Sequence, residues 1–185
     1  MRWLITNRNQ QKDIFGSDLD ELTFWTFDIT QKDKDIAKRS SWTKRDLEEF
    51  KTALVKITGK FPRPVDTAPE KQKHLTLFIH GYDNTWPAAV RRYDTIAKQL
   101  FDGPDSLGEL ISFDWPSKGS LLGYLPDRAE ARKTGDDLTN VLSALYDWMS
   151  GKQVEAADDP RDACRAKTSI IAHSKIGRAS CRERV

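Results

Sequence analysis

The stretch KTSIIAHS at Lys167–Ser174 decides the fold that this sequence predicts. Residues 169–172 form a short run rich in β-branched residues, which is typical of a buried central strand. The run ends at His173-Ser174, where we expect the chain to turn sharply into a helix. A serine at that turn projects its hydroxyl beside backbone N–H groups that can bind an oxyanion. Taken alone, the stretch fits either a nucleophile at Ser174 or an ordinary strand that ends in a polar turn.

A second stretch, LTLFIHGY at Leu75–Tyr82, also predicts a buried strand and favours the first interpretation. It ends at His80-Gly81 and is followed by a polar turn and a helix. An α/β hydrolase presents its oxyanion loop and then its nucleophile in this order along the chain. We expect the backbone N–H groups of Tyr82 and Lys175 to be the oxyanion donors, with Gly81 allowing close approach of the backbone.

Three stretches resemble an uncharacterised bacterial branch of the esterase/lipase-like α/β hydrolases: IHGYDNTW, ISFDWPSKGSLLGYLPDRAEARKTGDDL and SIIAHS. The resemblance covers roughly Lys73–Ser174, with a looser echo in ITNR at Ile5–Arg8. It implies a small-molecule ester or acyl substrate, a loop-shaping role for His80 and a partial α/β-hydrolase fold. In that fold helices flank a mostly parallel sheet, and the C-terminal strands and helices are missing. One departure is that Ile176 stands where the family has glycine, which arrives one position later at Gly177.

The last stretch, KIGRASCRERV at 175–185, is expected to be a non-native tail, because from Ile176 onward it matches one reading frame of a common sequencing adaptor. We therefore divide the chain into the N-terminal part of an α/β-hydrolase domain, 1–174, and this tail, 175–185. The alternative is a natural basic tail. Such a tail would suggest nucleic acid or membrane binding.

The composition argues against several classes of partner. The formal charge of +2 comes from the tail, so the rest of the chain is nearly neutral and offers no surface for nucleic acid. Outside the tail the single cysteine is Cys164, which argues against an internal disulfide and fits a reducing compartment. The N-terminal residues do not form the apolar h-region expected of a signal peptide, and no run reaches about 20 apolar residues. The sequence predicts a cytoplasmic protein with no membrane span and no cofactor, and it leaves the oligomeric state open.

A serine nucleophile needs a base that is oriented by an acid. In this fold both follow the serine along the chain. After Ser174 the sequence has one acid, Glu183 in the tail, and no histidine. We expect none of the upstream histidines (His74, His80, His173) to face the serine. The chain itself is therefore expected to be inactive, as a fragment of an active parent.

Loops at the carboxyl ends of the strands carry the candidates for substrate contact, Asn84, Trp86 and Trp115, although packing is an equally good explanation for each. Asp83 and Asp114 lie at the same edge and are expected to be turn residues, not metal ligands. A nucleotide-binding domain is disfavoured because no turn has its glycine pattern. A non-catalytic interaction module on a hydrolase scaffold stays open.

The expected elements follow the order strand–helix–strand–helix–strand along the chain, and this order predicts a parallel sheet with right-handed crossovers. Residues 9–20 are expected to form a loop, Thr43 to cap the first helix, and Leu47 and Leu100 to lie on buried helix faces. The expected strands are Trp3–Thr6, Leu22–Phe27, Leu75–His80, Leu110–Phe113 and Ser169–His173, and the expected helices are Thr43–Gly59, Trp86–Phe101 and Asp127–Met149.

Overall fold

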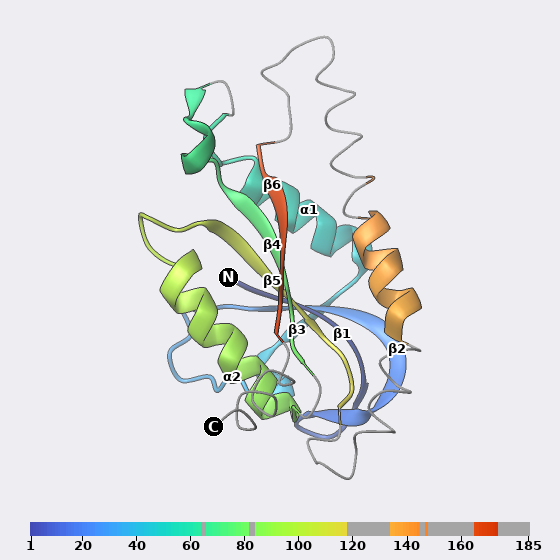
Figure 1. The fold of residues 1–185 in the computed structure, drawn as a ribbon. Coiled ribbons are helices and arrows are strands. Elements are labelled where there is room, and N and C mark those ends of the chain that lie inside the picture. The colour runs from blue at the N-terminus through green and yellow to red at the C-terminus, as the bar shows by residue number, and fades with distance from the viewer. Residues whose placement is uncertain (64–65, 82–83, 118–133, 145–146, 148–164, 174–185) are drawn as a thin grey trace, which may run out of the picture.

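A computed structural model describes residues 1–63, 66–81, 84–117, 134–144, 147 and 165–173. The strands are β1 (Arg2–Gln10), β2 (Phe15–Phe27), β3 (Thr43–Arg45), β4 (His74–Ile79), β5 (Gly108–Asp114) and β6 (Lys167–Ala172). The helices are α1 (Leu47–Thr58) and α2 (Trp86–Ile96), with short helical turns at η1 (Arg39–Ser41), η3 (Pro69–Lys71) and η4 (Ala97–Phe101). Residues 134–144 form a further helix, drawn in orange in Figure 1.

The strands form one six-stranded sheet in the order β3-β2-β1-β5-β4-β6. The neighbours β1, β5, β4 and β6 run parallel, while β2 is antiparallel to β1 and β3 is antiparallel to β2. The chain passes from β4 through α2 to the adjacent parallel strand β5, which is a β–α–β unit. The expected mostly parallel sheet flanked by helices is confirmed.

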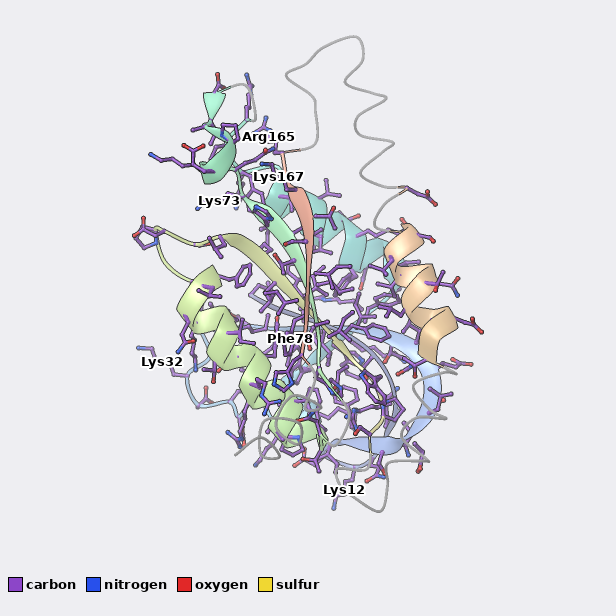
Figure 2. All side chains as sticks on the ribbon, viewed as in Figure 1. Lys12, Lys32, Lys73, Phe78, Arg165 and Lys167 are labelled. Atoms are coloured by element: carbon purple, nitrogen blue, oxygen red, sulfur yellow. The ribbon has the colours of Figure 1, made fainter. Side chains whose placement is uncertain are left out.

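Helices cover both faces of the sheet, with α2 on one side and α1 and helix 134–144 on the other (Figure 1). Each face carries its own apolar core because successive side chains of a strand point to opposite faces. Leu4 packs on the α2 side, whereas its neighbours Trp3 and Ile5 pack on the α1 side. Figure 2 shows Phe78 in the interior and Lys12 and Lys32 at the periphery.

The prediction of a loop over residues 9–20 is wrong at both ends, because both ends belong to strands. β1 runs on to Gln10, which pairs with Phe15 at the start of β2, so the two strands form a long hairpin. The outer half of the hairpin is polar. It can still form paired strands, because the hydrogen bonds between strands come from the backbone and do not depend on the side chains. Register shifts between Thr6 and Gln10 interrupt the ladder, and such irregularities bend a strand.

The first helix begins later than expected, and Thr43 is not its cap. Thr43–Arg45 pairs with β2, and the N-cap is Asp46, whose side chain accepts from the N–H of Glu49 at 2.7 Å. The end at Gly59 is confirmed.

Two side chains expected on buried helix faces are instead exposed. Leu47 is 41% exposed and Leu100 is 44% exposed. Leu100 lies in η4, a π-helical segment whose wider turn shifts the side-chain register relative to an α-helix. Phe101 is buried in its place.

The strand that precedes Ser174 is not the buried central strand that was expected. Within the described part of the chain β6 is an edge strand paired with β4, and its residues alternate between half-buried and exposed. Ile170 is 51% exposed, while Ile171 packs against the core on the α2 side. The apolar run correctly predicts a strand, but the prediction that this strand is buried is wrong.

Candidate active site

The two strand ends singled out in the sequence lie next to each other. β4 and β6 are paired in register from His74 with Lys167 to Ile79 with Ala172. Beyond that ladder the N–H of His173 donates to the carbonyl of Ile79 at 2.9 Å. The segments that follow β4 and β6 therefore start side by side at the carboxyl edge of the sheet. Three of the predicted site residues, Tyr82, Ser174 and Lys175, fall outside the described residues.

His80 is buried at this edge, and both of its ring nitrogens have partners. Nδ1 lies 2.7 Å from the Gly81 carbonyl oxygen, which can only accept, so Nδ1 carries the hydrogen. Nε2 lies 2.7 Å from a carboxylate oxygen of Asp114 and 3.2 Å from the backbone nitrogen of Trp115, and the His80 and Trp115 rings stack 5.3 Å apart. The Trp115 indole N–H returns to the His80 carbonyl at 2.9 Å. These contacts fit a loop-shaping role and leave neither nitrogen for a serine hydroxyl.

A buried ion cluster lies beneath the same turn. One oxygen of Asp114 accepts from Arg8 Nε at 2.7 Å, the other lies 2.7 Å from His80 Nε2, and all three side chains are at most 1% exposed. Burial raises the pKa of Asp114, but the charges and hydrogen bonds of Arg8 and His80 outweigh it, so the pKa is below its ordinary value. Arg8 also donates to the carbonyls of Gly16 at 2.9 Å and Asn84 at 3.0 Å.

Sequence reasoning missed this cluster. It treated Asp114 as a turn residue, because aspartate is common in turns. The partner Arg8 lies 106 positions away along the chain. The signal that pointed there was the resemblance of ITNR, which ends at Arg8. Among the residues that the structure describes, no group of three or more acidic, histidine or cysteine side chains could hold a metal ion.

The predicted substrate-side residues are placed in the same region, and all three are buried. Asn84 donates from Nδ2 to the Gly81 carbonyl at 2.8 Å, and its own N–H donates to Ser117 Oγ at 3.0 Å. The Trp86 indole N–H donates to the carbonyl of Ala37 at 2.7 Å. In this structure these side chains, with Trp115, shape and pack the turns.

The architecture and the paired strand ends define the class of protein: an α/β hydrolase-like fold in which His80-Gly81 and His173 stand at adjacent strand ends. The chain belongs to the family described as alpha/beta hydrolase of unknown function (DUF900), whose model matches residues 63–157. Comparisons with curated proteins and with solved structures find no match. No helix within the described ranges is long and apolar enough to cross a membrane.

Proposed function

We propose that this chain carries the nucleophile and the oxyanion loop of a serine hydrolase that acts on carboxylic esters or related small acyl substrates, with Ser174 as nucleophile. One observation supports this most strongly: β4 and β6 are adjacent and in register, and the His173 N–H bonds to the Ile79 carbonyl at 2.9 Å. The segment that carries Gly81 and the segment that carries Ser174 therefore begin at neighbouring points of the sheet edge.

The Gly81 carbonyl supports the proposed oxyanion site. It accepts from His80 Nδ1 at 2.7 Å and from Asn84 Nδ2 at 2.8 Å, so it is held by two side chains. In a trans peptide the N–H that follows a carbonyl points the opposite way. Fixing this carbonyl would therefore orient the Tyr82 amide, the proposed first donor, with Lys175 as the second. One oriented donor typically contributes about 10²–10³ in turnover.

The base and the acid of the triad are proposed to come from natural sequence that replaces the tail 175–185. His74 cannot serve, because it opens β4 at the opposite end of the strand from His80. His80 has both nitrogens engaged. Without a base, serine catalysis falls on the order of 10⁶-fold, so the 185-residue chain is proposed to lack useful activity.

The test uses the natural gene product that contains this sequence, treated with a fluorophosphonate probe and mapped by mass spectrometry. We expect labelling at Ser174, and we expect it to vanish in Ser174→Ala. The matched control is Ser169→Ala, a serine of β6 whose Oγ lies 2.7 Å from Thr76 Oγ1, inside the β4–β6 pair. A folded gene product that is not labelled would favour the second candidate, a non-catalytic interaction module.

A further inference from the structure

Arg92 of α2 bridges the turn after β4 and the end of β6. Its Nη1 lies 3.3 Å from Asn84 Oδ1 and 3.4 Å from His173 Nδ1. A guanidinium nitrogen only donates hydrogen bonds, and Nη1 carries two hydrogens. Both neighbours are therefore acceptors, and a single nitrogen joins the two segments.

Each acceptor is tied to one half of the proposed site. Asn84 donates from its amide to the Gly81 carbonyl at 2.8 Å. His173 directly precedes Ser174, and its N–H donates to Ile79 at 2.9 Å. We propose that Arg92 is a positioning residue that fixes the end of β6 against the turn after β4, and thereby sets where Ser174 stands relative to the Gly81 carbonyl. This inference rests on the proposed function.

The neighbouring arginine supplies the comparison. Arg91 is 62% exposed and lies 3.4 Å from the carboxylate of Asp35, itself 40% exposed. Such an exposed pair contributes little to stability. Arg91→Met therefore removes an arginine from the same helix without touching the bridge, and it is the matched control for Arg92→Met.

The first measurement is nitrogen NMR of the imidazole rings in the full chain, which contains only three histidines. The bridge requires His173 Nδ1 to be an acceptor, so its proton must lie on Nε2. We expect Arg92→Met to shift the ring-nitrogen signals of His173, because the guanidinium no longer donates to Nδ1, and to weaken the exchange protection of its amide at least about fivefold, the effect of losing one ordinary hydrogen bond. Arg91→Met should change neither. Arg92→Lys, which keeps a donor, should preserve the Nε2–H form.

Unchanged His173 signals in a folded Arg92→Met chain would overturn the bridge. If Arg92→Met does not fold, the wild-type spectrum decides: a His173 proton on Nδ1 there contradicts the bridge.

The second measurement separates this inference from the proposed function. In the natural gene product we expect Arg92→Met to slow the covalent step of fluorophosphonate labelling about tenfold or more, with initial binding unchanged, because small misplacements of a reacting group cost up to about 10²-fold. Altered His173 signals with unchanged labelling would refute the positioning role. Intact His173 behaviour in a gene product that is never labelled would refute the proposed function and leave the bridge standing.

Discussion

His80 Nε2 lies 2.7 Å from Asp114 Oδ1, and neither side chain is more than 1% exposed. Because Arg8 occupies the other oxygen of the same carboxylate, Asp114 balances positive charge that has no access to water. The cluster joins β1, β5 and the residue after β4. The proposed active site is therefore built on a buried ion cluster.

Replacing the central carboxylate should be costly. In Asp114→Asn the Arg8 guanidinium loses its counter-charge while it remains buried, and breaking a buried pair in this way costs about 3–5 kcal/mol. The measurement is the free energy of unfolding in urea. The control is Asp35→Asn, which breaks the exposed pair with Arg91 and should cost at most about 1 kcal/mol. Similar losses in the two variants would contradict a structural role for the cluster.

The same carboxylate should make stability depend on acid pH. The pKa of Asp114 is lower in the folded chain than its ordinary value of about 3.9, so the folded state favours the ionised form. That contribution is fully present above the ordinary pKa and is lost as pH falls through the folded pKa.

We therefore expect the gap in unfolding free energy between wild type and Asp114→Asn to narrow as pH is lowered from about 4 to about 2. Urea titrations of both proteins across that range measure the gap directly. A gap that stays constant over the range would show that the carboxylate is not preferentially ionised in the fold.

Glu109 should give the opposite trend. Burial raises its pKa, although the Trp3 indole N–H donates to its Oε2 at 2.8 Å. The folded state therefore disfavours its ionised form, so stability falls as pH rises through the titration. Glu109→Gln keeps an acceptor for Trp3 and removes the charge. It should be more stable than wild type at pH 7 and equal to it near pH 3, as measured by thermal unfolding at both values.

The elements that the sequence predicted best are those with strong local signals. β4 lies close to its expected bounds, and α2 with the π-helical η4 together span the expected helix, since an unbroken apolar run and a helix with proline in its first turn are local features. The β1–β2 hairpin was missed because its outer half is polar and is held by backbone pairing. The expected burial of β6 failed because burial depends on what covers a strand, and its own residues do not encode that.

In the candidate site, too, the features that are local in sequence were predicted and the contacts between distant residues were not. His80 and Gly81 were found because they are adjacent in sequence at a strand end. The link from Arg8 to Asp114 spans 106 positions and depends on which strands become neighbours in the sheet. Neither residue type predicts that pairing. Arg8 and Asp114 meet because β1 and β5 are neighbouring parallel strands.

Gly108 should tolerate substitution much less well than Gly103. Both have positive φ, 132° and 86°. A Cβ on Gly108 would overlap the backbone of His74 at the start of β4, whereas a Cβ on Gly103 meets nothing within 4 Å. Gly103→Ala should cost only the backbone term, about 1–2 kcal/mol. Gly108→Ala should cost about 1–3 kcal/mol more, because backbone must move. Urea unfolding of the pair provides the comparison, and equal losses would contradict the steric contribution.

The exposed edge of the sheet should control association of this chain. Ile170 is 51% exposed on β6, an edge strand of the described sheet, and apolar edge strands promote strand-to-strand aggregation. Ile170→Lys places a charge on that edge, so we expect less light scattering on concentration and a change in stability within about 0.5 kcal/mol. Ile171→Lys is the matched control, because Ile171 packs against the core on the α2 side. It should lose about 1–2 kcal/mol of stability. If Ile170→Lys aggregates as readily as wild type, association proceeds through another surface.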